Sequence, residues 1–174
     1  MKKLIFLFIL AFSTISQAQM RNGQRRSQLP QTQQRQPPEP DFKVDKYLGI
    51  VVYDIKKAAK KSSVKLSSKE GKEFSKVLTK YNKDIKDFRR INSFVLRSTK
   101  DMIDNFQKKA MKSGDFSNQP KIVKQMNENL KPISETLKKE DEKLDKSMKS
   151  LLSEKQYKKW IKYNKKLNKV FKKE

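Results

Sequence analysis

Apolar side chains recur every three or four residues from Phe42 to the end of the chain. This spacing places them along one side of an α-helix, and no run of strand-like alternation persists. The pattern therefore predicts an all-α protein. We expect four helices, at about 44–61, 67–112, 118–151 and 153–171.

The second of these helices would be long for a protein of this size. Its apolar stripe runs from Phe74 to Phe106, and an unbroken helix of ~45 residues would measure about 65–70 Å. Gly114 should end this helix, and Pro120 suits the first turn of the next one. Pro132 lies inside that third helix and should kink it. We therefore expect an elongated, kinked antiparallel bundle or hairpin, whose broad stripes are covered by a second copy in a homodimer.

Two short segments share a helix-start pattern. Ser153 and Gln156 have the spacing of a capping box, in which each side chain bonds the backbone N–H of the other residue. Ser67 and Glu70 repeat this spacing. We interpret all four side chains as structural caps.

The N-terminus has the pattern of an export signal. The basic pair Lys2-Lys3 precedes a short apolar run, and small residues lead to a cleavage site after Ala18. The apolar run is about half of the ~20 residues that a membrane-spanning helix needs. Cleavage near Ala18 would give a periplasmic or secreted protein. We predict a signal peptide at 1–18, a disordered Gln-, Arg- and Pro-rich linker at 19–42, and one helical domain at 43–174.

The composition excludes several kinds of chemistry. The chain has no cysteine and no histidine. It therefore cannot form disulfides, build a His-dependent catalytic triad or bind zinc through imidazole or thiolate. The acidic residues between 140 and 145 lie on one helix without an EF-hand loop, so we interpret them as a Lys-paired surface. We predict no enzyme activity, no cofactor and no metal site.

The net charge of +24 at pH 7 favours anionic partners. These include acidic unfolded chains, lipid head groups and lipopolysaccharide, while the predicted export disfavours nucleic acid. The simpler alternative is a solvated surface that keeps a thin helical protein in solution.

The segments Leu66–Glu70 (LSSKE) and Leu152–Gln156 (LSEKQ) resemble the twice-occurring Leu-Thr-x-x-Gln motif of the Spy/CpxP group of periplasmic proteins. Both segments have Ser in place of Thr, and the first has Glu in place of Gln. The resemblance implies a cradle-shaped dimer of bent helices. It also implies ATP-independent binding of unfolding envelope proteins on a basic face, or envelope-stress sensing. Metal-binding members of this group use histidine, which this chain lacks.

The leading hypothesis is therefore an exported chaperone or stress-response binding protein. Two alternatives stay open. One is an envelope adaptor that binds anionic lipid or lipopolysaccharide through the basic last helix. The other is a regulatory partner of a membrane stress sensor.

Four residues near the middle of the chain are candidates for client binding. Phe94 lies about 120° away from the apolar stripe of its helix, so we expect it to be exposed. Arg89, Arg90 and Arg97 surround it, and arginine can bind carboxylates through two hydrogen bonds. Their simpler role is to balance the charges of neighbouring aspartates.

Asp141 is an exception on the third stripe, where apolar residues stand on either side. It could pair with a lysine across an interface, or it could mark the place where a thin bundle opens to water. We favour the second interpretation.

Overall fold

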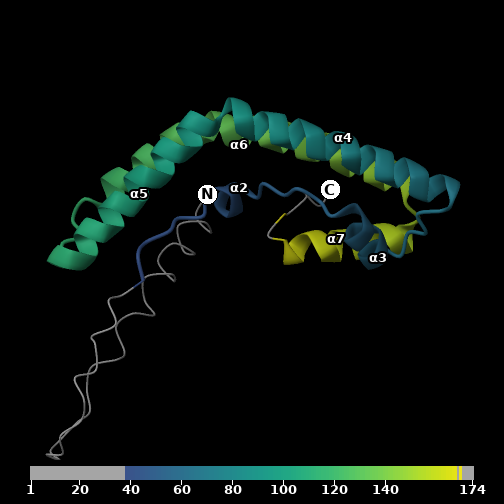
Figure 1. Ribbon diagram of the computed structural model, residues 1–174, viewed down its shortest axis with the longest axis horizontal. Coiled ribbons are helices and arrows are strands. Elements are labelled where there is room, and N and C mark those ends of the chain that lie inside the picture. Colours follow the sequence, from purple (N-terminus) through teal and green to yellow (C-terminus); the bar gives the residue numbers. More distant parts are fainter. Residues whose placement is uncertain (1–37, 168, 170–174) are drawn as a thin grey trace, which may run out of the picture. The chain divides into compact units, whose positions relative to one another are not determined.

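The computed structural model describes residues 38–167 and Lys169. Within these residues the chain forms helices and no strands, which confirms the all-α prediction. The predicted signal peptide and most of the predicted linker lie outside the described residues. The helices are α2 (Val44–Leu48), α3 (Ile55–Ser62), α4 (Lys69–Ile91), α5 (Ser93–Ser113), α6 (Gln119–Leu151) and α7 (Glu154–Lys166) (Figure 1).

The longest helix, α6, supports most of the others. It packs against α5 near its beginning and against α4 further along, and α7 returns against it. The short helix α3 packs on α7 and α4. The buried side chains of α4 and α6 recur at helical steps and belong to one core, which α5 shares near the beginning of α6: Phe74, Leu78, Tyr81, Ile85 and Phe88 on α4, with Met126, Leu130, Ile133, Leu137, Leu144 and Met148 on α6.

The prediction of one helix at 44–61 is wrong, because the structure divides this segment into α2 and α3. Gly49 ends α2 in the left-handed conformation with φ 70°, which glycine adopts at little cost. An extended stretch follows, and the side chain of Asp54 then caps α3. Asn82 holds the stretch in place by exchanging two hydrogen bonds with the backbone of Tyr53, at 2.7 and 2.8 Å. The apolar spacing continues across this break and so could not reveal it.

The prediction of one helix at 67–112 is also wrong. Asn92 separates α4 from α5, with φ −93° and ψ 8°. Its side-chain amide donates to the carbonyl of Phe88 at 2.8 Å, and its own N–H donates to the same carbonyl at 3.1 Å. Such local bonds from Asn side chains compete with the regular helix. Ile91, the last residue of α4, is 73% exposed, although the sequence placed it on the apolar stripe.

The helix α6 begins and continues as the sequence predicts. Gly114 ends α5 with φ 74°, and a proline lies in the first turn of α6. The helix passes through Pro132 without interruption, and its ribbon bends in the region where α4 gives way to α5 (Figure 1). Pro132 lies between Asn129, whose side chain donates a hydrogen bond to Thr99 of α5, and Asp141, which accepts one from Tyr81 of α4. The bend of α6 therefore accompanies the break between its two partners.

The capping box at the start of α7 is confirmed. The N–H of Ser153 donates to the side-chain oxygen of Gln156 at 2.9 Å, and the N–H of Gln156 donates to the Ser153 hydroxyl at 3.4 Å. Two backbone donors that the first turn would leave unpaired are thus satisfied.

The predicted cap of the other segment is wrong by one residue. The N-cap of α4 is Ser68, whose hydroxyl accepts from the N–H of Gly71 at 3.0 Å, so Ser67 and Glu70 are not the capping pair. A Cβ on Gly71 would lie 2.1 Å from the carbonyl oxygen of Lys65. The loop before α4 therefore crosses directly over its first turn, and only glycine leaves room for it.

Aromatic side chains gather where α3, α4 and α7 meet. We call Tyr53, Phe74, Tyr81, Trp160 and Tyr163 the aromatic hub. Trp160 is fully buried, with Phe74 edge-on at 5.9 Å and Tyr53 at 5.1 Å between ring centroids. Phe74 and Trp160 each stand seven residues after the first Ser of the repeated segment. The two copies of the sequence pattern thus deliver one ring each to the same cluster.

Candidate functional site

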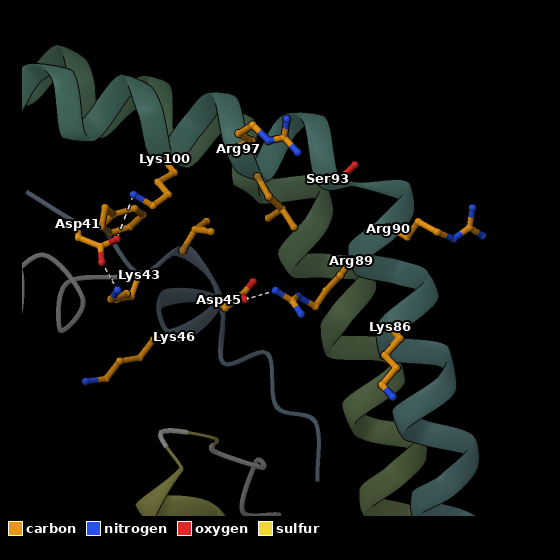
Figure 2. A pocket seen from close by; sticks show the side chains of 13 residues that line it. Asp41, Lys43, Asp45, Lys46, Lys86, Arg89, Arg90, Ser93, Arg97 and Lys100 are labelled. Carbon is orange, nitrogen blue, oxygen red and sulfur yellow. Dashed lines mark hydrogen bonds and ion pairs between the residues drawn. The ribbon is translucent and has the colours of Figure 1, made fainter.

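A basic groove of 810 Å³ lies beside the junction of α4 and α5. Its walls come from residues 41–46, from the end of α4 and from the first turns of α5 (Figure 2). Phe42 and Leu96 add apolar surface. Only Asp41 and Asp45 are acidic among the lining residues. The basic ones are Lys43, Lys46, Lys86, Arg89, Arg90, Arg97 and Lys100.

All three candidate arginines line this groove, but they differ in their partners. Arg89 pairs with Asp45 at 2.6 Å and so ties α4 to α2. Arg90 lies 3.5 Å from Asp87 on its own helix, and Figure 2 shows it directed away from Asp45. Arg97 has no carboxylate within ion-pair distance among the described residues. Arg90 thus balances the charge of a neighbouring aspartate, whereas Arg97 is available to a ligand.

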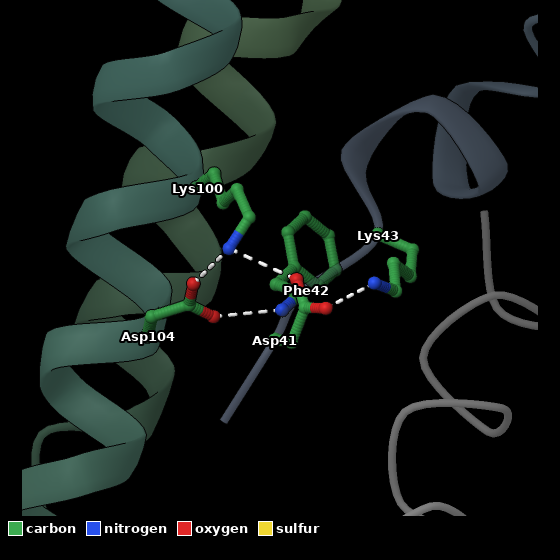
Figure 3. Close-up of polar contacts among 5 residues, drawn as sticks. All are labelled: Asp41, Phe42, Lys43, Lys100 and Asp104. Atoms are coloured by element: carbon green, nitrogen blue, oxygen red, sulfur yellow. Dashed lines mark hydrogen bonds and ion pairs between the residues drawn. The ribbon is translucent and has the colours of Figure 1, made fainter. Parts of the chain in front are cut away.

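A strap formed by residues 38–48 closes one side of the groove. Asp41 pairs with Lys43 and, at 3.0 Å, with Lys100, which also pairs with Asp104 (Figure 3). Asp104 in turn accepts the N–H of Phe42 at 2.7 Å. Hydrogen bonds from Lys43 and Lys100 lower the pKa of Asp41, and bonds to Asp104 and Asp41 raise the pKa of Lys100. The last residues of the predicted linker are therefore held against α5.

Two large apolar side chains stand out at the elbow, which we define as residues 90–97 around the break at Asn92. Phe94 is 80% exposed and Ile91 is 73% exposed, the highest values for large apolar residues in the described part. The exposure of Phe94 agrees with its predicted helical position. That of Ile91, which the sequence placed on the apolar stripe, was not predicted. With Arg90 and Arg97 nearby in the chain, the elbow combines apolar and cationic side chains.

Asp141 lies in a buried polar cluster next to the aromatic hub. Its carboxylate accepts from the Tyr81 hydroxyl and pairs with Lys169, both at 2.7 Å. The Lys169 side chain is 1% exposed and also donates to the carbonyl of Gly49 at 3.1 Å. The interpretation that Asp141 marks an opening to water is wrong. It pairs with a lysine, but with one from the same chain.

The electrostatics of this cluster indicate a structural role. Burial raises the pKa of Asp141 and lowers the pKa of Lys169, because each charge is desolvated more than its partner compensates. Burial, with the nearby Asp141 charge, also raises the pKa of Tyr81. Sequence reasoning missed Lys169 because nothing in a run of surface lysines distinguishes one that turns inward.

The described residues contain no group of three or more acidic side chains that could hold a metal ion. No helix among them combines the length and apolar character required to cross a membrane. Comparison of the chain with protein-family models, curated proteins and solved structures finds no match.

Proposed function

We propose that this protein is an exported, ATP-independent chaperone or stress-response binding protein that holds unfolding proteins at its elbow. The observation that carries the proposal is the pair Ile91 and Phe94, two large apolar side chains that are exposed to water and lie next to Arg90 and Arg97 in the chain. Isolated exposed apolar residues are common on protein surfaces. A pair of them three residues apart, at the junction of two helices that also supply cations to a groove, suits the apolar and acidic side chains that a partly unfolded chain exposes.

The geometry suits loose and reversible binding. Contact with two apolar side chains gives modest affinity, and the cations add long-range attraction for acidic segments. Clients could therefore bind and leave without nucleotide hydrolysis. The resemblance of the repeated helix-start segments to the Spy/CpxP group supports the same proposal. The predicted export signal at 1–18 supports a periplasmic or secreted location.

The proposal is tested by light scattering of a reduced, aggregating model protein, such as α-lactalbumin, without nucleotide. We expect the wild-type protein to suppress aggregation. Changing Ile91→Ser together with Phe94→Ser should raise the concentration for half-suppression about tenfold, because about 1.4 kcal/mol of apolar contact is lost. Helicity should be unchanged, since both side chains are exposed.

A matched control comes from the far end of the same helix. Met111 is also exposed, at 40%, but lies away from the elbow. Met111→Ser should leave suppression unchanged. Absence of suppression by the wild-type protein at several-fold excess would overturn the function. Equal loss in the Met111 variant would overturn the site.

A further inference from the structure

A second basic surface lies on α3 and α7, apart from the groove. Together these helices carry ten lysines and a single acidic residue, Glu154. The much longer α6 carries eight lysines but six carboxylates. The positive charge of the described helices is therefore concentrated on α3 and α7 rather than spread evenly.

The lysines of each helix occupy one sector. On α3 they span about 140° and on α7 about 120°, counted at ~100° per residue. The buried residues lie on the opposite sectors: Ala58, Ala59 and Ser62 on α3, with Trp160, Tyr163 and Asn164 on α7. The helix α3 packs on α7, and the pair packs on α4 and α6, while every lysine of α3 and α7 is exposed. We call this surface the lysine face.

Most of these charges are not neutralised within the described part of the chain. Lys158 pairs with Glu154 and Lys159 donates to the Ser63 hydroxyl at 2.8 Å, and the others have no ion pair with a carboxylate among the described residues. None of them lines the groove. Like charges so close together repel each other and raise the free energy of the folded state, unless an anionic partner binds them.

We propose that the lysine face docks the protein onto the anionic surface of a lipid bilayer. Ten exposed lysines on two helices that pack on each other concentrate positive charge in one part of the molecule, and such a cluster attracts a layer of anionic head groups. None of the large exposed apolar residues of the described part lies on α3 or α7 itself, so attachment is electrostatic and reversible. Single-stranded nucleic acid fits less well, because its binding surfaces combine cations with exposed aromatic rings for stacking. Docking here leaves the elbow on other helices free for clients.

The test is co-sedimentation of the purified protein with vesicles of phosphatidylcholine containing about a third phosphatidylglycerol, compared with pure phosphatidylcholine. We expect binding only to the anionic vesicles, and its loss in high salt. Each lysine near an anionic bilayer contributes roughly fivefold. A variant with five substitutions to Gln, at Lys57, Lys60, Lys155, Lys162 and Lys166, should therefore bind at least about a hundredfold more weakly.

A matched control removes the same number of charges from exposed positions of α6. These are Lys121, Lys131, Lys138, Lys139 and Lys146, all changed to Gln. This control should keep most of the binding, and circular dichroism should show both variants folded. An equal loss in the two variants would overturn the proposal in favour of net charge alone.

Two further arms separate other outcomes. In the first, inorganic polyphosphate replaces the vesicles. If polyphosphate binds through the lysine face and anionic vesicles do not bind, the assignment to lipid is overturned. The Ile91→Ser, Phe94→Ser variant should bind vesicles like the wild type, so failure of the chaperone proposal leaves this one to be decided separately.

Discussion

The two ends of α6 are supported in different ways. Near its C-terminal end α3, α4 and α7 surround the aromatic hub, where Tyr53 and Phe74 each contact Trp160. Near its N-terminal end α6 packs with α5 as a two-helix arm, against which the strap is the only other segment of residues 38–167 that packs. Four of the five described aromatic pairs belong to the hub. The comparison indicates that stability is concentrated at the hub, while the arm can open locally.

This difference bears on the proposed function. The elbow stands at the junction between the well-supported and the weakly supported helices, where α4 ends at Ile91 and α5 begins at Ser93. A binding site there is anchored on one side by the hub. On the other side it can adjust with the arm, which suits partners of varied shape.

The largest effect should come from Trp160→Ala. This side chain is fully buried among rings, so its removal should cost about 3–5 kcal/mol of the free energy of unfolding. Ile103→Ala, in the buried face of the arm, should cost about 2–4 kcal/mol. Urea unfolding followed by circular dichroism measures both.

Hydrogen exchange then distinguishes the two ends. The Trp160 change should lower amide protection in all helices, because the hub limits global unfolding. The Ile103 change should lower it mainly in α5 and the first half of α6. Equal effects of both changes on every helix would show a single cooperative unit and would remove the distinction between hub and arm.

A smaller effect, with a defined pH dependence, should follow from Lys169→Met. At pH 7 it leaves the Asp141 carboxylate largely buried with only Tyr81 as partner. Breaking a fully buried pair costs 3–5 kcal/mol, but Asp141 keeps a fifth of its side-chain exposure, so we expect about 2 kcal/mol.

The pH dependence has a definite sign. Without Lys169, burial holds the pKa of Asp141 still further above its value in the unfolded chain. The folded state then binds the proton more tightly than the unfolded state, so stability falls as pH rises through that window. The penalty should be smallest near pH 4 and largest at neutral pH, measured by urea unfolding at both. Adding Asp141→Asn should remove this dependence, and a penalty that grows towards acid pH would contradict the account.

Local signals in the sequence predicted the helical class and several helix ends. Gly114, Pro120 and the Ser153–Gln156 box act through their nearest neighbours, and the structure places each of them as expected. The apolar spacing was misleading where it continued across a break. Gly49 and Asn92 were the local signals for those breaks, but a Gly or Asn within a regular stripe ends a helix only when the surrounding structure supports the turn.

Features that depend on distant residues could not be predicted. The contact between Lys169 and Asp141 joins the end of the chain to α6, and no spacing reveals it. The candidate site was likewise predicted only in part. The sequence indicated the three arginines and Phe94. It did not indicate the groove, which the strap lines and where Asp45 pairs with Arg89.

The smallest effects should come from the caps of the two hub helices α4 and α7. Ser153→Ala and Ser68→Ala each leave a first-turn N–H without its partner and should each cost about 1 kcal/mol. Ser67→Ala is the matched control. It changes an exposed hydroxyl next to a cap, so its effect should stay within about 0.5 kcal/mol. Thermal unfolding resolves differences of this size, and a Ser67 effect equal to that of Ser68 would restore the original alignment of the two segments. If Ser68 and Ser153 contribute to stability and Ser67 does not, the two segments correspond in the aromatic ring that each contributes to the hub, Phe74 and Trp160. They then differ in the position of the residue that caps the helix.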